Sequence, residues 1–258
     1  MGNFVYDFTQ KFGSTVTATQ NVDTTHGPVA RIEDLGRPRR TVRSTDLVTD
    51  MQIDIDLGSP VSLTAITYEN TNLLGLNFLF DDNPSFTSPV DSGLVVVGTD
   101  PADLRIKQYH ISAAGSLRYV RIVGDKDNVI TGDAYMEIGA VGLWALPTTL
   151  SANVGIPFEK SIESRADVLE LRGGGQEVGL DSPLVVRFGM TIRYRGGDAV
   201  EAQIQALAAI PRHTVGLLYE NNGNTSEVYH VHRAGDFSFR RGAGAVETVS
   251  GMDFLEVA

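Results

Sequence analysis

The heptapeptide Met51-Gln52-Ile53-Asp54-Ile55-Asp56-Leu57 alternates apolar and polar residues, with an apolar residue at every odd position. Because successive side chains of a β-strand point to opposite faces of the sheet, this pattern predicts a strand with one buried and one solvated face. Gly58-Ser59-Pro60 follows it, and we expect this tripeptide to end the strand, since proline cannot donate to a β-ladder. A second strand is predicted over 61–68, with a bulge near Ala65.

Similar short β patterns recur along the first half of the chain. Clusters of turn-forming residues separate them, such as Asp81-Asp82-Asn83-Pro84. The predicted strands cover 76–80, 94–97, 104–109, 117–123 and 135–146. Regular spacing of this kind is typical of a β-sandwich or jelly roll.

The segment 147–157 is polar, small and bounded by two prolines, which suits a connector between two cores. We therefore expect two domains, a jelly roll with an N-terminal extension over 1–146 and a second, mainly β assembly domain over 147–258. In the second domain, 186–194 alternates apolar residues with an arginine-rich set. Further strands are predicted at 215–219, 228–233, 237–241 and 252–257, which favours a second sandwich-like fold and an all-β chain.

One short helix is predicted in the second half. Asp198 and Glu201 form a capping box, and Val200, Ile204 and Leu207 fall on one helical face. Pro211 is expected to stop this helix.

Composition excludes several classes of protein. The formal net charge is −11, which argues against nucleic acid as a partner because phosphate binding requires clustered Lys and Arg. The absence of cysteine excludes disulfides, thiolate catalysis and cysteine-ligated metals. The N-terminus lacks the pattern of a secretory signal, and no run of 18 apolar residues occurs, so we expect synthesis in the cytoplasm without a membrane anchor.

Candidate catalytic and ligand-binding motifs all have plainer interpretations. The glycine runs at 171–176 and 195–198 lack the spacing of a nucleotide-binding loop. His230 and His232 share a strand face but have no identifiable third metal ligand, so two solvated polar residues are the favoured interpretation. Acidic pairs could bind calcium or act as acid and base on a sugar, but each lies on a strand's wet face or in a turn. The pairs are Asp54/Asp56, Asp81/Asp82 and Asp125/Asp127.

The remaining candidates are a basic cluster and three aromatic residues. Arg37-Pro38-Arg39-Arg40 with Arg43 could dock on an acidic neighbour, although a solvated loop is favoured. Trp144, Tyr135 and Tyr119 follow strand patterns and are assigned to the core before any sugar-stacking role. The sequence thus predicts no catalytic, cofactor-binding or metal-binding residue, no cofactor and no enzyme activity.

Three motifs resemble those of a known fold. Asp56-Leu57-Gly58 followed by a strand resembles the opening of galactose-binding-like, discoidin-type jelly rolls, and the pair 117–123 and 134–143 resembles their closing strands. The turn Asn70-Thr71-Asn72-Leu73 is similar to one in such domains of tailed-phage virion proteins, which carry a second β domain and a final strand resembling 251–257. Aromatic and arginine sugar-binding loops of glycan-binding relatives are not found.

The resemblance implies a structural component of a tailed-phage virion, such as a minor tail, tail-tip or baseplate and collar protein. Its implied partners are other virion proteins and copies of itself in a ring or symmetric oligomer, and its implied location is the virion after assembly in the host cytoplasm. A host-surface glycan-binding module is the alternative function. A glycan depolymerase ranks last, because no carboxylate pair can be assigned opposing roles.

Overall fold

The computed structural model describes most of the chain, in fifteen segments. These are residues 3–36, 40–93, 95–96, 107–110, 115–130, 132–145, 147–149, 154–195 without 164–165, 171–176 and 182–184, 199–221, 228–241 without 236, and 246–256. They group into two compact units. The sandwich unit draws on Thr9–Thr148 and Gly223–Val228, and the sheet unit on Met1–Phe8, Thr149–Asn222 and Tyr229–Ala258.

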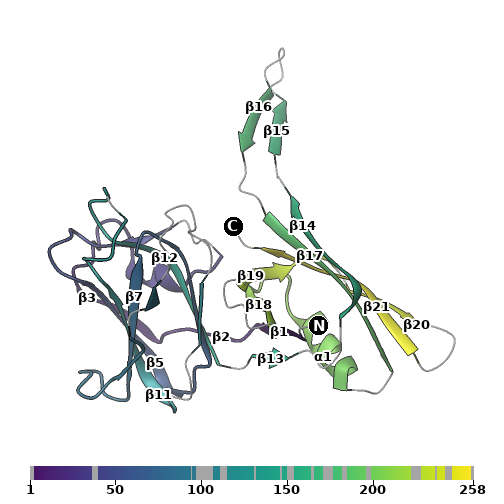
Figure 1. The fold of residues 1–258 in the computed structure, drawn as a ribbon, viewed down its shortest axis with the longest axis horizontal. Coiled ribbons are helices and arrows are strands. Elements are labelled where there is room, and N and C mark those ends of the chain that lie inside the picture. The colour runs from purple at the N-terminus through teal and green to yellow at the C-terminus, as the bar shows by residue number, and fades with distance from the viewer. Residues whose placement is uncertain are drawn as a thin grey trace. The chain divides into compact units, whose positions relative to one another are not determined.

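The sandwich unit contains two antiparallel sheets (Figure 1). The first has the order β3-β5-β11-β7-β8, with β9 beside β7, and the second has the order β10-β6-β12-β2, with β4 beside β12. The first sheet comprises β3 (Thr15–Gln20), β5 (Met51–Val61), β7 (Gly75–Asp81), β8 (Val90–Asp91), β9 (Val95–Val96) and β11 (Leu117–Gly124). The second comprises β2 (Gln10–Lys11), β4 (Val42–Arg43), β6 (Ala65–Thr71), β10 (Lys107–His110) and β12 (Glu137–Trp144), and the 3-10 helix η1 spans Val29–Glu33.

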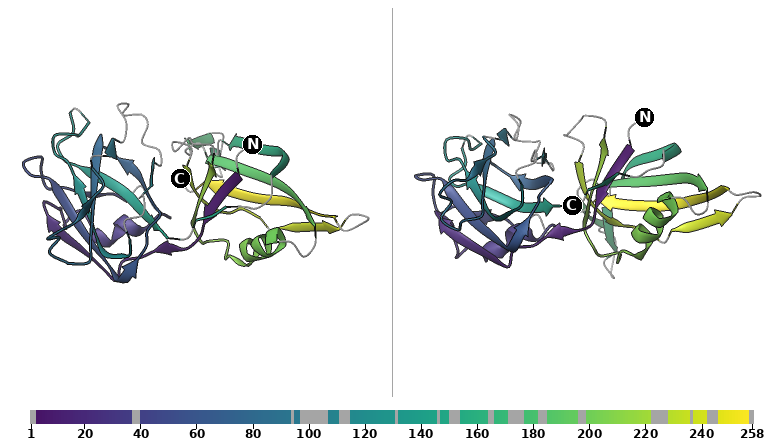
Figure 2. Two further views of the ribbon diagram at one scale, coloured as in Figure 1. Left: turned by 60° about the horizontal axis from the view of Figure 1, so that its bottom comes forward. Right: turned by 90° about the horizontal axis from the view of Figure 1, so that it is seen from below.

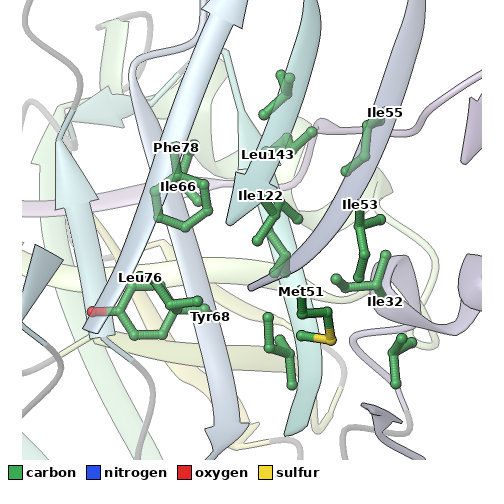
Figure 3. Packing of buried hydrophobic residues seen from close by; sticks show 14 of the residues in the cluster. Ile32, Met51, Ile53, Ile55, Ile66, Tyr68, Leu76, Phe78, Ile122 and Leu143 are labelled. Atoms are coloured by element: carbon green, nitrogen blue, oxygen red, sulfur yellow. The ribbon is translucent and has the colours of Figure 1, made fainter. Parts of the chain in front are cut away.

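A single apolar core lies between the two sheets (Figure 3). Ile53 and Ile55 of β5 are fully buried, as the alternating heptapeptide predicts, and they share the core with Ile122 of β11. The rings of Tyr68 on β6 and Phe78 on β7 lie 6.3 Å apart and link one sheet to the other. Each such side chain contributes about 1.5–3 kcal/mol on burial, so this core holds the sandwich without disulfides.

The first strand runs further than its sequence predicts. β5 continues through Gly58-Ser59-Pro60 to Val61, whereas proline was expected to stop it. Pairing with β11 passes from Asp56 opposite Tyr119 to Val61 opposite Leu117, so no residue of β11 is paired with Pro60. Pro60 therefore needs no ladder donor, and the strand tolerates it.

The sheet unit is built on one eight-stranded sheet (Figures 1 and 2). Its strand order is β13-β1-β18-β19-β21-β17-β14, with β20 beside β21. The strands are β1 (Asn3–Asp7), β13 (Thr148–Thr149), β14 (Val154–Glu163), β17 (Val185–Arg195), β18 (Gly216–Asn221), β19 (Val228–Arg233), β20 (Ser238–Arg241) and β21 (Val246–Glu256). A separate hairpin consists of β15 (Ala166–Glu170) and β16 (Glu177–Asp181).

Helix α1 (Ala199–Ala209) packs against this sheet, and the prediction of its apolar face is confirmed. Val200, Ile204 and Leu207 are buried against a cluster that includes Phe188 of β17 and Phe254 of β21. The predicted cap, Asp198, lies outside the described residues. The all-β class with one short helix is confirmed.

Both ends of the chain contribute to the sheet unit. β1 pairs with β18, from Asn3 opposite Asn221 to Asp7 opposite Leu217. The start of the chain is thus grouped with its second half, whereas the sequence predicts domains over 1–146 and 147–258. Across the described helices, none combines the length and apolar character needed to cross a bilayer.

Candidate functional site

Several connecting segments emerge at one end of the sandwich. Met51 at the start of β5 pairs with Gly124 at the end of β11, and Gly124 also pairs with Leu76 near the start of β7. In the second sheet Thr71 at the end of β6 pairs with Ile138 near the start of β12. This end, which we call the loop end, is formed by residues 21–26, 40–50, 72–74, 125–130 and 132–136.

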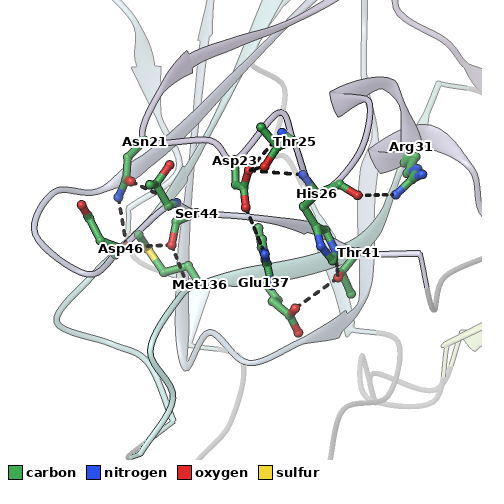
Figure 4. A network of polar contacts seen from close by, with 12 residues as sticks. Asn21, Asp23, Thr25, His26, Arg31, Thr41, Ser44, Asp46, Met136 and Glu137 are labelled. Carbon is green, nitrogen blue, oxygen red and sulfur yellow. Dashed lines mark hydrogen bonds and ion pairs between the residues drawn. The ribbon is translucent and has the colours of Figure 1, made fainter.

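Asp23 anchors a network of polar side chains at the loop end (Figure 4). Its Oδ2 accepts hydrogen bonds from Nε and Nη2 of Arg43, at 3.2 and 3.0 Å. Its Oδ1 accepts hydrogen bonds from the Thr25 hydroxyl at 2.5 Å and from the Thr25 and His26 amides at 3.0 and 3.2 Å. These bonds, first from Thr25 and then from Arg43, lower the pKa of the Asp23 carboxyl to about 2, so Asp23 is ionised and Arg43 is held in place.

Arg43 joins this anchor to the start of β12. Its guanidinium lies over the Tyr135 ring, 4.9 Å from the centroid, and its backbone pairs with Glu137. The Thr41 hydroxyl donates to Glu137 Oε1 at 3.3 Å and lies 3.4 Å from His26 Nε2. Because Thr41 has a single hydroxyl proton, His26 Nε2 must be the donor in its contact, and neutral His26 then has an acceptor at Nδ1.

Four side chains of this network keep hydrogen-bonding atoms that no described protein group uses. They are Arg43 Nη1, Glu137 Oε2, His26 Nδ1 and the Tyr135 hydroxyl. All four residues are half-buried, and the side chains of Arg43 and Asp23 are 31% and 16% exposed. The loop end therefore presents a guanidinium donor and a carboxylate acceptor that are already fixed by protein contacts.

Asn72 fixes the segment that carries Tyr135 and Glu137. Its Oδ1 accepts a hydrogen bond from the Glu137 amide at 2.6 Å. Its Nδ2 donates to the Tyr135 carbonyl at 2.7 Å and to Asp133 Oδ2 at 2.8 Å. Asn72 is 8% exposed, so these three contacts are well shielded from water on the Asn72 side.

A second set of hydrogen bonds, made by Asn21 and Ser44, fixes the preceding loop. The Asn21 amide nitrogen donates to the Asp46 and Thr49 carbonyls at 3.2 and 2.5 Å. The Ser44 hydroxyl donates to the Asp46 carbonyl at 2.7 Å and accepts from the Met136 amide at 2.8 Å. Apart from the bond of Asn72 to the Asp133 side chain, these hydrogen bonds of Asn72, Asn21 and Ser44 all go to backbone groups, so the residues around Arg43 keep one geometry.

The predicted acidic pair Asp54/Asp56 lies elsewhere, on the outer face of the first sheet. Asp54 accepts two bonds from Arg121, at 2.6 and 2.8 Å, and Asp56 accepts two from Arg118, at 2.7 and 2.8 Å. Arg121 also stacks over Phe86, 4.2 Å from the ring centroid. These carboxylates are therefore neutralised by neighbouring strands, which agrees with their assignment to a strand's wet face.

The other acidic pairs form local turns. Asp81 accepts hydrogen bonds from the amides of Asn83 and Ser88, and Asp125 accepts one from the Asp127 amide. Within the described part of the chain, no three His, Asp or Glu side chains are arranged to hold a metal ion.

The two histidines for which a solvated strand face is predicted, His230 and His232, differ in burial. His230 on β19 is completely buried, so the interpretation as a solvated pair is wrong for it, and His232 is half-buried. Trp144 is buried as predicted, and its Nε1 donates to Thr67 Oγ1 at 2.8 Å. Tyr135 is only half-buried, because β12 begins two residues after it.

Two predicted motifs lie largely outside the described residues. Of the basic cluster, residues 37–39 are not described, Arg40 is exposed, and Arg43 belongs to the loop-end network. The glycine runs at 171–176 and 196–198 are not described either. Sequence reasoning did not single out Asp23, His26 or Glu137. The one available signal was Asp23-Thr24-Thr25-His26, which has the composition of an Asx turn.

Comparison with known proteins adds likenesses to solved structures only. No protein-family model matches the chain, and no curated protein matches it. A carbohydrate-binding module of family 32 from AlyQ, in complex with 4,5-unsaturated mannuronic acid, is 18% identical and has a TM-score of 0.43. That match covers 54% of this chain and 99% of the module.

Two further modules are similar at the same level. The first family 32 module of a family 31 glycoside hydrolase from Clostridium perfringens is 12% identical over 52% of this chain and 96% of that one, with a TM-score of 0.41. The family 62 module of Clostridium thermocellum Xyl5A is 17% identical over 54% and 98%, with a TM-score of 0.37. At these identities and TM-scores, the likenesses support no conclusion about function.

Proposed function

We propose that the sandwich unit binds a carbohydrate at its loop end. The observation that carries this proposal is the fixed set of Arg43, Glu137, His26 and Tyr135, each with a hydrogen-bonding atom that the described protein leaves unused. Each hydroxyl of a sugar can donate to a carboxylate and accept from a guanidinium, so adjacent hydroxyls match this donor and acceptor pair. Fixing the protein groups beforehand lowers the entropic cost of binding.

The charges at the loop end favour an uncharged sugar. Asp23 and Glu137 are two carboxylates, and the guanidinium of Arg43 bonds to Asp23 while its backbone pairs with Glu137. The Arg43 charge is already compensated by Asp23, so an anionic ligand bound at Arg43 would face the Glu137 carboxylate. We therefore expect neutral glycans to bind better than uronic-acid or sulfated glycans, with weak dependence on salt.

A glycan array with neutral and acidic glycans, followed by calorimetry on the best neutral glycan, tests this function. Arg43→Ala is expected to weaken binding at least tenfold because it removes a donor and releases Asp23. Failure of every glycan on the array to exceed background at high protein concentration would contradict the proposal.

Arg121→Ala is the matched control. Arg121, like Arg43, donates through Nε and Nη2 to an aspartate and stacks on an aromatic ring, and its side chain is 19% exposed. It lies in mid-strand on the outer face of the first sheet rather than at the loop end. Affinity should change less than twofold in this variant, and equal losses in both variants would show that binding does not use the loop end.

A second candidate function is that of an assembly subunit, as the resemblance to tailed-phage virion proteins implies. Hairpin β15–β16 supports it, because this hairpin pairs with no other described strand and an isolated two-stranded hairpin is marginally stable in water. Mass spectrometry of purified particles from a producing host is the test. Presence of the chain at a fixed ratio to the other particle proteins is expected, and its absence would rule out a virion role.

A further inference from the structure

The backbone of His26 is held on both sides by hydrogen bonds. Its amide donates to Asp23 Oδ1 and to the Asp23 carbonyl, at 3.2 Å in each case. Its carbonyl accepts a hydrogen bond from Nη1 of Arg31, also at 3.2 Å (Figure 4). Arg31 belongs to the 3-10 helix η1, so this bond ties the turn at residues 23–26 to the element that follows it.

Gly27 provides the room that Arg31 needs for this bond. A Cβ atom at residue 27 would lie 2.9 Å from Nε of Arg31 and would overlap its Cζ and Nη1. The three atoms nearest to such a Cβ all belong to Arg31. The guanidinium therefore lies directly on the glycine backbone, and a side chain at residue 27 would displace it.

The imidazole ring of His26 is fixed through Thr41. The Thr41 hydroxyl donates its proton to Glu137 Oε1, so His26 Nε2 is the donor in its contact with Thr41. In neutral histidine the other ring nitrogen, Nδ1, is then an acceptor. Anchors at the amide, at the carbonyl and at Nε2 thus give Nδ1 a fixed position and a single hydrogen-bonding role.

We propose that Arg31 is a positioning residue for carbohydrate binding, and that it holds His26 Nδ1 where this atom accepts a hydrogen bond from one sugar hydroxyl. The inference rests on the proposed function and narrows its ligand class. An acceptor nitrogen binds a free hydroxyl but not an ether oxygen, which has no proton to donate. A site built to bond a hydroxyl rejects an analogue that lacks it, so the glycans that bind carry an unsubstituted hydroxyl opposite His26.

Calorimetry with the neutral glycan that gives the highest signal on the array tests the role of Arg31. Arg31→Ala should weaken binding about fivefold, the worth of one well-placed hydrogen bond. Gly27→Ala should cause a similar loss, because the new methyl group displaces the flexible arginine side chain while the backbone stays in place. In the Arg31→Ala background, the atoms that this methyl group would meet are gone, and Gly27→Ala should change the affinity less than about twofold.

Arg40→Ala is the matched control. It removes the same charge from an exposed arginine of the loop end, next to Thr41 in the chain. Within the described loop end no hydrogen bond joins Arg40 to His26, so the affinity should stay within about twofold of the unsubstituted protein. Equal losses in Arg40→Ala and Arg31→Ala would show an effect of charge alone and would overturn the inference.

Mono-O-methyl derivatives of the same glycan test the ligand class. At least one derivative should bind the unsubstituted protein about fivefold more weakly than the parent glycan. That difference should vanish in His26→Ala, which has no acceptor to lose. If no derivative shows a loss that depends on His26, the requirement for a free hydroxyl opposite this residue is wrong.

NMR on the protein without glycan separates this inference from the proposed function. Three-bond couplings about the Cα–Cβ bond of His26 should report one staggered rotamer in the unsubstituted protein and in Arg40→Ala, and rotamer averaging in Arg31→Ala and Gly27→Ala. A single rotamer in Arg31→Ala would refute the positioning role. Averaging in that variant together with an array that detects no glycan would contradict the proposed function, while showing that Arg31 does position His26.

Discussion

Asn72→Asp should destabilise the sandwich unit in a pH-dependent manner. The substitution keeps the shape of the side chain and the acceptor for the Glu137 amide. It replaces the nitrogen that donates to the Tyr135 carbonyl and to Asp133 Oδ2 with an oxygen. At neutral pH this oxygen is negatively charged and faces two acceptors, so both contacts become repulsive.

The expected loss follows from these contacts. Two hydrogen bonds are lost, at about 1 kcal/mol each. Repulsion between two charges at ~4 Å is about 1 kcal/mol in water and about 4 kcal/mol at a protein surface. We take the lower value because Asp133 is exposed to solvent, which gives a total of about 3 kcal/mol at pH 7.

Acid should restore part of this loss. Repulsion raises the pKa of the new carboxyl in the folded state above its value in the unfolded chain. Protonation therefore favours the folded form, and the deficit shrinks as pH falls through that raised pKa. Asn72→Ala, which carries no charge, should lose a similar free energy of unfolding at pH 7 without this recovery.

Urea unfolding followed by tryptophan fluorescence measures both effects. Trp144 is the only tryptophan in the sequence and is fully buried in β12, so its emission reports unfolding of the sandwich. Equal stability of Asn72→Asp and the unsubstituted protein at pH 7 would refute the reasoning, and so would a deficit that does not change between pH 7 and pH 4.5.

Two further predictions concern the same unit. The first is a double-mutant cycle of Trp144→Phe and Thr67→Val, with unfolding followed by circular dichroism. The coupling energy should be about 1 kcal/mol, which is the net value of the buried hydrogen bond from Trp144 Nε1 to Thr67 Oγ1. A coupling energy near zero would show that this bond adds nothing to stability. Because the pKa of Asp23 is lowered to about 2, its stabilising contribution is complete above the unfolded value and is lost as pH falls through about 4 toward 2. Asp23→Asn should flatten this part of the stability profile measured by urea unfolding, and an unchanged acid slope would contradict the assignment.

Alternation made the first sheet predictable from sequence. Ile53 and Ile55 are buried and Asp54 and Asp56 lie on the wet face, because a strand with one covered face enforces a period of two. Alternation of apolar and polar residues does not show where the pairing of a strand with its neighbour is interrupted. The rule therefore predicts that Pro60 ends β5, although residues 57–60 have no partner on β11 and the strand continues to Val61.

The loop-end network could not be predicted in this way. Asp23, Arg43 and Glu137 are far apart in sequence and come from a loop, the two-residue strand β4 and the start of β12, so no periodicity connects them. These three side chains come together only because β4 pairs in register with β12 and because Asn72 bonds to the Glu137 amide. Tyr135 was assigned to the core for a related reason, since the sequence placed the start of its strand two residues too early.

The pairing of β1 with β18 has a consequence for how the protein is made. Phe4 lies opposite Glu220, 216 positions later in the chain. On a ribosome, the polypeptide between them emerges before this pair can close, so the sandwich has time to fold while the first strand waits without its neighbour. β18 must therefore be synthesised before β1 can pair, and a deletion of β1 would uncover an edge of β18, a strand more than 200 positions later in the chain.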